Sequence, residues 1–416
     1  MSPTKRREGQ TLMRESSPRG LLAGFGRRAA LRFIILLGTV GFFANVTYEG
    51  ARSSTGSFLA DLGASGMAVG VVAGLGELLS YALRLLAGYV ADRTGKHWAI
   101  MILGYAMDMA AVPLLALTNR WEVASALMLA ERVGKGIRTP VRDAMLSHAT
   151  HEVGHGWGFG LHEVLDQSGA IVGPLVLAAI LHFKQGYRAG FGILLVPALL
   201  TMAMLVAVQR LFPHPHDLEA GTATPEGRGF PKTFWLSLGA ASLIAAGFVD
   251  FPLIAYHFEK RYIVPLSWIP ISYALAMGVD ALAALAFGRL FDRRGLTAMV
   301  AATLLSSLFA PLVFRGTFFT AMLGMALWGI GMGTQKTIMR AVVAGLVPAG
   351  RRGSAYGLFG ACFGVAWLLG SALKGWLYDV SLGSMISTSI IAQLTAVPLL
   401  LVVAKRSSRV DGLRDS

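Results

Sequence analysis

Residues 88–95 read GYVADRTG, and residues 288–295 read GRLFDRRG. The two stretches share a glycine at each end and an Asp-Arg pair between them, and they lie 200 residues apart. Each follows the second long apolar run of its half of the chain. Self-similarity at a fixed shift indicates an internal repeat. The sequence therefore predicts two related halves, each carrying this stretch after its second helix.

The composition places these halves in a membrane. Of the 416 residues, 54% are hydrophobic and only 14% are charged, whereas soluble chains carry about 25% charged residues. A membrane-spanning helix needs about 20 mostly apolar residues, so the apolar content suffices for about a dozen spans. A disulfide scaffold is excluded because Cys362 is the only cysteine. We expect a polytopic, all-α membrane protein.

Apolar windows between polar breaks predict twelve transmembrane helices in two six-helix bundles. They cover residues 31–50, 65–90, 98–117, 121–137, 157–183, 191–211, 234–256, 267–290, 297–314, 318–343, 353–377 and 384–404. The midpoint stretch 213–232 is rich in proline and glycine and is expected to be a linker. The predicted organisation is a basic tail (1–30), a first bundle (31–212), the linker (213–232), a second bundle (233–404) and a basic tail (405–416).

The net charge of +14 could suggest a nucleic-acid partner, but the basic residues cluster in alternate hydrophilic breaks and at both ends. An excess of Lys and Arg on one side of a series of spans is the positive-inside pattern. We therefore expect a plasma (inner) membrane protein with both termini in the cytoplasm. The expected partners are the lipid bilayer and a small solute, with no nucleic acid, and no obligate protein partner is evident.

The repeated stretch resembles the loop signature of the major facilitator superfamily, which joins the second and third helices of its members. The signature residues are Gly88, Asp92, Arg93, Gly95 and Lys96, with a second copy at Gly288, Asp292, Arg293 and Gly295. The resemblance extends from about residue 31 to residue 404, and the signature is broken only at His97. It implies a secondary transporter whose halves rock around a central cavity, with these loops gating the cytoplasmic side.

Two further matches resemble the proton-coupled, drug-exporting branch of that family. Arg132 and Gly136 match an R-x-x-x-G element in the fourth helix. The fifth helix carries an antiporter-like pattern at Gly160, Gly169, Gly173 and Pro174. This resemblance implies proton-coupled efflux and a bent helix, with simple close packing as the alternative role of the glycines. The last two glycines of the pattern are replaced by Leu177 and Ala178, so uptake by a symporter stays open.

Ionisable residues within apolar segments are costly and mark transport pathways by default. Most lie in the first half, and a carboxylate there could be neutralised by a proton and release a basic partner. The coupling candidates are Glu131, Arg132, Glu163, Asp166, Glu77, Arg84, Glu49 and Arg52. Glu77 and Arg84 are seven residues apart and so share a helix face. The substrate candidates are Asp250, Lys336 and Asn45. Structural ion pairs are the alternative reading of the charged set.

The segment 134–160 is expected to leave the membrane, with Pro140 ending the fourth helix. His148, His151 and His155 follow, and a solvated or pH-responsive loop is expected there. Metal binding is not expected because no known ligand spacing occurs. No cofactor is expected, and the coupling ion is expected to be H⁺.

No motif of a hydrolase, metalloprotease or nucleotide-binding enzyme occurs. The hydrophilic segments are also too short for a catalytic domain. The sequence therefore predicts a non-enzymatic secondary transporter. Two alternatives are a membrane enzyme that uses the histidines and a non-transporting sensor or scaffold with the same fold.

Overall fold

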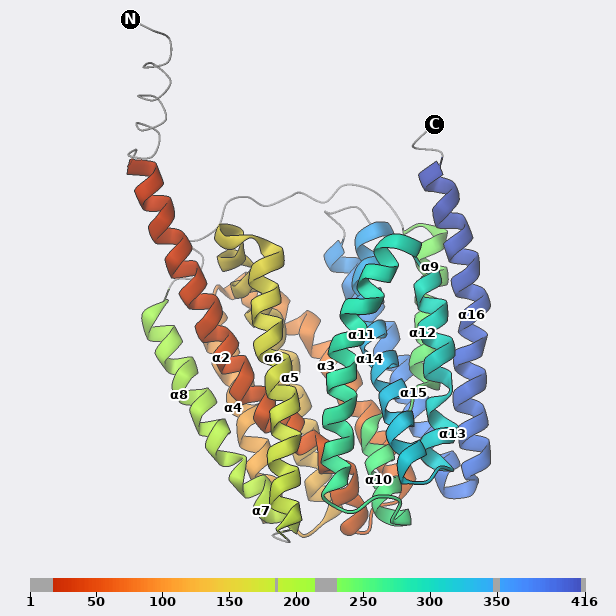
Figure 1. Ribbon diagram of the computed structural model, residues 1–416. Helices are drawn as coiled ribbons and strands as arrows, with labels where there is room; N and C mark the ends of the chain where they lie inside the picture. Colours follow the sequence, from red (N-terminus) through yellow and green to blue (C-terminus); the bar gives the residue numbers. More distant parts are fainter. Residues whose placement is uncertain (1–17, 184–185, 214–229, 347–351, 413–416) are drawn as a thin grey trace, which may run out of the picture.

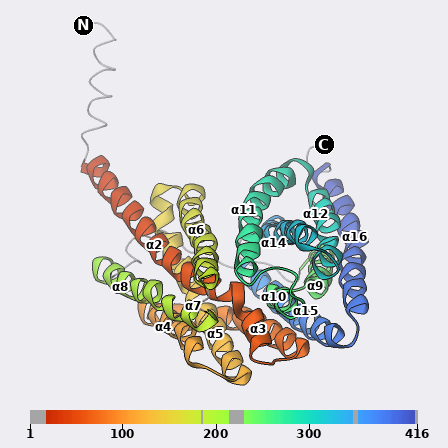
Figure 2. The ribbon, with the colours of Figure 1, turned by 60° about the horizontal axis from the view of Figure 1, so that its bottom comes forward.

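The computed structural model describes residues 18–183, 186–213, 230–346 and 352–412. Within these residues the regular structure is helical throughout. The helices of the first half are α2 (Pro18–Asp61), α3 (Gly66–Thr94), α4 (His97–Leu114), η1 (Leu115–Leu117), α5 (Trp121–Val153), α6 (His155–His182), α7 (Gly186–Ile193) and α8 (Leu195–Leu211). Figure 2 shows them gathered in one bundle.

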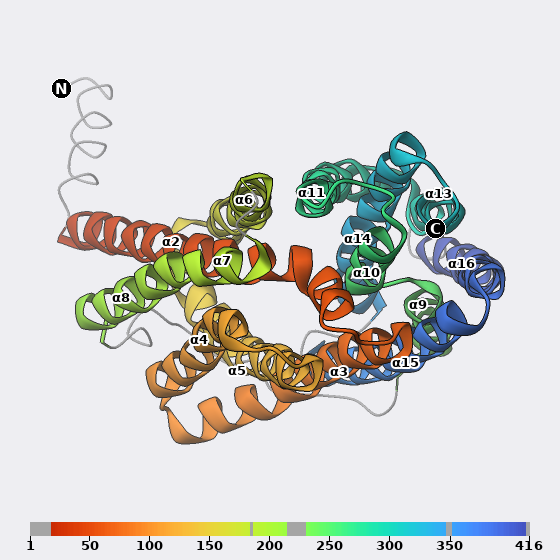
Figure 3. The same cartoon turned by 90° about the horizontal axis from the view of Figure 1, so that it is seen from below.

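A second bundle holds the other half of the chain (Figures 2 and 3). Its helices are α9 (Lys232–Gly247), α10 (Phe251–Arg261), α11 (Trp268–Arg294), α12 (Thr297–Ser307), α13 (Phe309–Phe314), α14 (Phe318–Leu346), α15 (Arg352–Val380) and α16 (Leu382–Gly412). The two bundles lie side by side, so the fold is the predicted pair of all-α halves.

Ten helical segments of the described chain are long and apolar enough to cross a membrane. The helices α5 and α14 have 33 and 29 residues and run alongside them (Figure 1), which completes twelve crossings. The beginning of α2 and the end of α16 lie on the same side of the molecule. We call this side the terminal face and the other side the far face.

The internal repeat is visible in how α3 and α11 end. Gly95 follows α3 with φ 65°, and Gly295 follows α11 with φ 58°. Only glycine adopts such positive φ values without strain, and a glycine after the last turn is a common helix stop. Both glycine N–H groups donate to the carbonyl four residues earlier, but ψ is 4° at Gly95 and −143° at Gly295, so the two helices end at equivalent positions with different backbone conformations.

Several predicted helix boundaries differ from the observed ones. Helix α2 already begins at Pro18, within the stretch expected to be a tail. The span expected at 234–256 is divided between α9 and α10, with Phe248–Asp250 between them. The side chain of Asp250 accepts a hydrogen bond from the backbone N–H of Phe251 and so caps α10. The break between the two helices places the Asp250 carboxylate inside the bundle, where the residue is 2% exposed.

The expectation that Pro140 ends the fourth helix was wrong. Helix α5 continues through Pro140 to Val153, and the next helix begins at His155. Proline removes the donor that would pair with the Gly136 carbonyl, and a membrane helix tolerates this where neighbouring helices pack around the site. The segment expected to be a loop is therefore helical, with its only interruption at Gly154, where φ is 95°.

The two bundles meet mainly through three helix pairs, α3 with α15, α6 with α11, and α2 with α10, and α10 with α3 and α11 with α2 also touch. Glycines allow the closest approach near the far face. A Cβ on Gly74 would lie 2.8 Å from Cα of Leu368, and one on Gly375 would lie 2.5 Å from the carbonyl oxygen of Gly66. Small residues let helix backbones approach in this way. The bundles are thus in backbone contact toward the far face.

Candidate functional site

A cavity of about 270 Å³ lies between the two bundles. Its lining runs along α5 from Arg132 to Asp143, whose side chain is 50% exposed. Exposed Glu163 of α6 also lines it. On α2 the lining ends at Arg52, before the close contact that Gly56 makes with α10. The cavity therefore lies on the terminal-face side of the close backbone contact between α2 and α10, and a hydrogen bond from Gln167 of α6 to Asp280 of α11 joins the bundles beside it.

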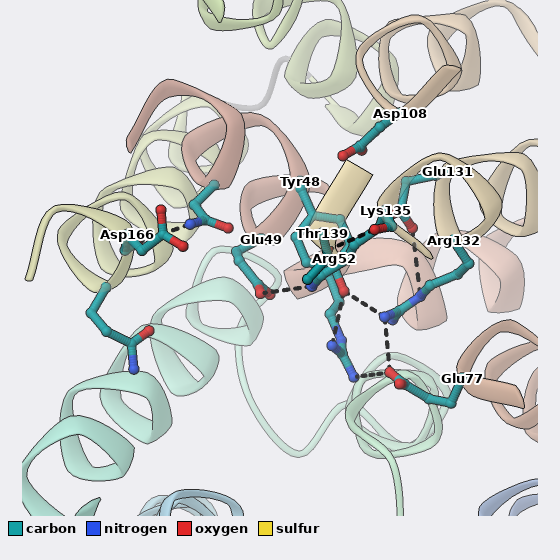
Figure 4. A network of polar contacts seen from close by, with 12 residues as sticks. Tyr48, Glu49, Arg52, Glu77, Asp108, Glu131, Arg132, Lys135, Thr139 and Asp166 are labelled. Atoms are coloured by element: carbon teal, nitrogen blue, oxygen red, sulfur yellow. Dashed lines mark hydrogen bonds and ion pairs between the residues drawn. The ribbon is translucent and has the colours of Figure 1, made fainter. Parts of the chain in front are cut away.

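At the inner end of this cavity, two arginines share one tyrosine and one carboxylate (Figure 4). The hydroxyl of Tyr48 accepts hydrogen bonds from Arg52 at 3.0 Å and from Arg132 at 2.5 Å. Glu77 Oε1 accepts from Arg132 at 2.8 Å and from Arg52 at 3.3 Å. These side chains come from α2, α3 and α5. The network thus ties three helices of the first bundle together through charge-assisted hydrogen bonds.

A second part of the network reaches into the other bundle. Glu49 lies 3.8 Å from Lys135 Nζ, and its other oxygen accepts a 2.6 Å hydrogen bond from Tyr273 of α11. Arg52 Nη2 lies 3.0 Å from Oδ1 of Asp250, where α10 begins. Both contacts join residues of different halves. They can therefore exist only while the bundles are closed together at this depth.

Asp250 also has a cation within its own bundle. Lys374 of α15 is 1% exposed and donates a hydrogen bond to the carbonyl of Ala246, two residues from the break between α9 and α10. No ion pair within 4.0 Å joins Lys374 to a carboxylate among the described residues. The ion-pair partner of the Asp250 carboxylate is therefore Arg52 of the first half, and Lys374 is a second buried basic group in the bundle of Asp250.

Further contacts close the far face. The carboxylate of Asp379, near the end of α15, accepts hydrogen bonds from the backbone N–H groups of Gly66 and Met67 at 3.0 and 2.8 Å. A carboxylate at a helix N-terminus is stabilised by the free N–H groups and the helix dipole. Tyr256 donates to the carbonyl of Ala64 at 3.1 Å, and Tyr187 donates to Glu259 at 2.9 Å. All four bonds join the two halves.

A buried ion pair within the first bundle supports the cavity wall from behind. Arg138 Nε lies 2.7 Å from Asp108 Oδ2, and the two side chains are 2% and 0% exposed. The Arg138 guanidinium also lies 4.5 Å from the ring centre of Tyr105. Because this pair joins α4 to α5 and does not touch the second bundle, we assign it a structural role.

We expect Asp108→Ala to lower the stability of the protein by about 3 to 5 kcal/mol, because it leaves Arg138 charged, buried and unpaired. Thermal unfolding of the purified protein in detergent measures the change. The matched control is Asp143→Asn, which removes the half-exposed partner of Arg142 on the same helix and should change stability by less than about 1 kcal/mol. Equal stabilities for the two variants would contradict the structural role.

The structure places the remaining coupling candidates in different surroundings. Glu131 lies 3.5 Å from Arg132 and lines a separate small cavity of about 40 Å³ with apolar neighbours. Its Oε1 is buried with no hydrogen-bond partner among the described residues. Asp166 lies 3.1 Å from Arg142. Arg84 contacts the ring of Tyr81 rather than Glu77, so spacing along the helix did not identify its neighbour.

The predicted gating loop of the first half is exposed in this conformation. Asp92 is 79% exposed and lies 3.9 Å from His97, and Arg93 lies over the ring of Tyr89 at 5.2 Å. Lys96 precedes α4, and Gly88 would bring a Cβ 3.7 Å from Pro140. No contact with the second bundle is recorded for this loop among the described residues. Its gating role stays a prediction.

In the second half, Arg293 is exposed, whereas the side chains of Asp292 and Lys336 lie outside the described part of the chain. The same holds for His148, His151 and His155. Asn45, the other substrate candidate, lines the cavity and donates a hydrogen bond to the carbonyl of Asp166 at 3.2 Å.

The glycines of the fifth span pack against α2. A Cβ on Gly169 would lie 3.0 Å from the Asn45 side chain, and one on Gly173 would lie 2.9 Å from the Gly50 nitrogen. Gly160 has no neighbour within 4 Å of a Cβ, and α6 continues through Pro174. Gly169 and Gly173 therefore serve close packing within the first bundle, and the predicted bend stays untested.

Sequence reasoning did not single out several residues of the site. Lys135 and Arg142 follow Arg132 along α5, and their charges within an apolar segment were a visible signal. Tyr273, Phe363 and Trp367 line the cavity from the second half. An aromatic residue in a membrane helix carries no comparable signal, because the rotation of the helix decides what it faces.

Two six-helix bundles related by an internal repeat, with a polar cavity between them at mid-depth, define a secondary transporter. Comparison with known proteins supplies the family. The model of the Major Facilitator Superfamily matches residues 35–371 and, in a second match, residues 251–414. The chain belongs to the Major Facilitator Superfamily and is an integral membrane transporter of that type, as its resemblance predicted.

Relatives by sequence and by structure agree with this family. An uncharacterized protein of Mycobacterium tuberculosis is 40% identical over 382 residues, 90% of this chain and 93% of its own length. An uncharacterized MFS-type transporter of Methanocaldococcus jannaschii is 28% identical over 84% of this chain and 89% of its own length. The nucleoside transporter NupG superposes with a TM-score of 0.69 at 14% identity, covering 91% of this chain and 98% of that chain. The structural likeness shows the fold alone.

Proposed function

We propose that the protein exports a small solute from the cytoplasm by proton-coupled alternating access. The observation that carries the proposal is the cavity between the bundles, which ends at contacts joining the two halves toward the far face. With both termini in the cytoplasm, this conformation faces inward. Rocking the bundles would break the far-face contacts and bring the terminal-face ends together, where the Asp92 and Asp292 loops would hold the outward-facing state closed.

Proton coupling rests on carboxylates in the first half. Glu163 lines the cavity and has no ion-pair partner among the described residues, so a proton from the cavity can reach it. Glu131 is buried beside Arg132 and would exchange its proton only when its surroundings open. Protonation of either carboxylate removes one negative charge and so weakens its attraction for the nearby arginines and lysines. Glu163 would take up the proton, and Glu131 with Arg132 would relay its effect to the helices that move.

The direction of transport is supported by a partial likeness to a multidrug resistance protein. The multidrug resistance protein MdtH of Yersinia pestis is 28% identical over 154 residues, 37% of each chain. The two missing glycines of the antiporter pattern favour the alternative, uptake by proton symport. The two directions predict opposite proton movements for the same solute gradient.

Proteoliposomes containing a trapped pH dye test this proposal. A panel of organic cations, sugars and carboxylates is added outside, and the internal pH is followed. An antiported solute drives protons outward as it enters, so the interior becomes alkaline, whereas a symported solute makes it acidic. A panel that moves neither solute nor protons through correctly folded protein would favour a sensor or scaffold.

We expect Glu163→Gln to abolish the solute-driven pH change while solute exchange across equal concentrations continues. The amide cannot carry a proton at this position but keeps the size of the side chain. Glu122→Gln is the matched control, since Glu122 lies in an exposed pair with Arg120. An unchanged pH signal in the Glu163 variant would remove this residue from the coupling mechanism.

A further inference from the structure

The two walls of the cavity differ in chemistry. The first bundle contributes the charged lining residues, from Glu49 on α2 to Asp166 on α6. The described lining residues of the second bundle carry no formal charge: Tyr273, Met277, Met332, Gln335, Phe363 and Trp367. A solute in this cavity therefore meets ionic groups on one side and an aromatic and thioether surface on the other. Such a pocket suits a molecule with an apolar body and one polar end.

The ion pairs among the lining residues indicate the charge that the polar end of the solute should carry. Five lining cations lie within 4.0 Å of carboxylates: Arg52, Arg132, Lys135, Arg138 and Arg142. Arg84 of α3 lines the same cavity, but no described carboxylate lies within that distance of it. Its Nε is buried and has no hydrogen-bond partner among the described residues. Arg52 Nε is buried and unpartnered as well, but Arg52 has two carboxylates within 4.0 Å. Arg84 is thus the described lining cation that has no described carboxylate within that distance.

Arg84 lies at one end of a row of three aromatic rings that crosses from the first bundle to the second. Its guanidinium is 5.0 Å from the ring centre of Tyr81. The Tyr81 ring is 5.7 Å from Phe363 of α15, and Phe363 is 5.6 Å from Trp367. A flat apolar group placed along these rings would bring an attached anionic group to the guanidinium.

Two further polar groups on the opposite wall point to the same ligand chemistry. Gln335 Nε2 and Trp367 Nε1 belong to lining residues, and both are buried with no hydrogen-bond partner among the described residues. Like Arg84 Nε, both are hydrogen-bond donors. Buried donors normally have acceptors, so a ligand group with several acceptor atoms, such as a carboxylate, would satisfy these three donors.

We propose that the transported solute is an organic anion with a flat apolar body, an aryl carboxylate in its simplest form. Its carboxylate lies at Arg84, and its body lies along Tyr81, Phe363 and Trp367. This inference rests on the proposed transport function and specifies the substrate class of the same cavity. Because the groups come from α3 and α15, which belong to different bundles, the solute contacts both halves and its occupancy is sensitive to their movement.

Binding to the purified protein in detergent tests the substrate class without requiring transport. The probes share one ring system and differ in charge: 2-naphthoate, 2-naphthamide and 2-naphthylmethylamine, with acetate as the anion that lacks a body. Ligand-induced thermal stabilisation, titrated in probe concentration, gives the affinities. We expect 2-naphthoate to bind at least about tenfold tighter than each of the others, as one charge-assisted contact implies. Tighter binding of the amine, or equal binding of all three, would overturn the proposal.

Variants locate the contact. Arg84→Gln should weaken 2-naphthoate about tenfold or more and leave 2-naphthamide unchanged, whereas Phe363→Ala should weaken both. The matched control is Arg120→Gln, which changes an arginine that is 73% exposed and lies outside the cavity. Unchanged affinity for 2-naphthoate in the Arg84 variant would contradict the assigned site. If this variant does not fold, the probe series on the unmodified protein still decides the substrate class.

The outcomes separate this inference from the transport proposal. Charge-selective binding of 2-naphthoate without proton-linked flux in proteoliposomes would sustain the substrate class and refute coupled transport. Proton-linked flux of a cation or a sugar, with no binding of 2-naphthoate, would sustain transport and refute the substrate class.

Discussion

Replacing Gly56 with alanine is expected to reduce transport about 10- to 100-fold while leaving membrane insertion intact. A Cβ at this position of α2 would overlap the carbonyl oxygen of Pro252 and lie 2.7 Å from the Cα of that residue. Both are backbone atoms of α10, so no side-chain rotation relieves the contact. Overpacking of this kind costs about 1 to 3 kcal/mol, and each 1.4 kcal/mol shifts an equilibrium about tenfold.

The Gly56 substitution raises the free energy of the conformation that is closed at the far face. Helices α2 and α10 belong to different bundles and touch where the far face is closed. When the bundles separate there, the added methyl group has room, so the variant should favour the state that is open at the far face. A transporter must visit both states in each cycle. Stabilising one of them slows the return from it, and this explains why a single methyl group should have so large an effect.

Spin labels report this shift without knowledge of the solute. Leu117 and Tyr262 are 78% and 87% exposed and lie on the far-face side of the first and second bundles. Cysteines at these positions, in a Cys362→Ser background, allow the distance between the bundles to be measured by pulsed electron paramagnetic resonance. We expect a longer distance in the Gly56 variant. Gly160→Ala is the control, because a Cβ there meets nothing within 4 Å; identical distances in both variants would refute the account.

The overall fold could be predicted because its signals are local in sequence. Apolar windows identify spans one by one, and the repeated stretch ending at Gly95 and Gly295 marks the end of the second helix in both halves. Helix interruptions were less predictable. Pro140 lies inside α5 although proline usually ends or kinks a helix, because neighbouring helices pack around it and such packing comes from the tertiary structure.

The candidate site could be predicted only as a set of residues. Charges within apolar segments are unusual enough to be found in the sequence, and Glu49, Arg52, Glu77 and Arg132 all belong to the network. Their pairing was not predictable. Glu77 shares a helix face with Arg84, yet it binds Arg132, which is 55 residues away, and Arg52 binds Asp250, which is 198 residues away. Helix rotation and packing decide such pairs, and neither is encoded in the spacing within one helix.

Asp250→Asn is expected to reduce transport at least about tenfold by removing the ion pair between the bundles. Asp250 has two roles at once: its Oδ1 accepts from the Phe251 N–H, which caps α10, and it also binds Arg52 of the other half. Asparagine caps helices about as well as aspartate, so this substitution removes the charge and keeps the cap. Removing one partner of a buried charge pair typically costs about 2 to 5 kcal/mol.

The physical reason for the large effect is that the carboxylate is buried, with Arg52 of the other half as its ion-pair partner and Lys374 as the buried basic group of its own bundle. In the observed state Arg52 lies 3.0 Å from Asp250, while Arg52 also contacts Glu77 of its own bundle. When the bundles part at the far face, Arg52 can keep Glu77 and Asp250 can turn toward Lys374, so neither charge is left unpaired. Asparagine has no charge to pair with Arg52 in the observed state or with Lys374 after the bundles part. Arg52 loses one of its two carboxylates in the observed state, and Lys374 has no carboxylate to receive in the other state.

Three variants measured together separate these contributions. Asp250→Ala removes both cap and charge and should be less stable than Asp250→Asn by about 1 kcal/mol, the usual worth of a helix cap, with a similar loss of transport. Lys374→Met should slow transport without lengthening the Leu117–Tyr262 distance, because it affects Asp250 only after the bundles separate. Glu122→Gln serves as the surface control. Wild-type transport by Asp250→Asn would show that the close packing at Gly56, and not the ion pair, holds the far face closed.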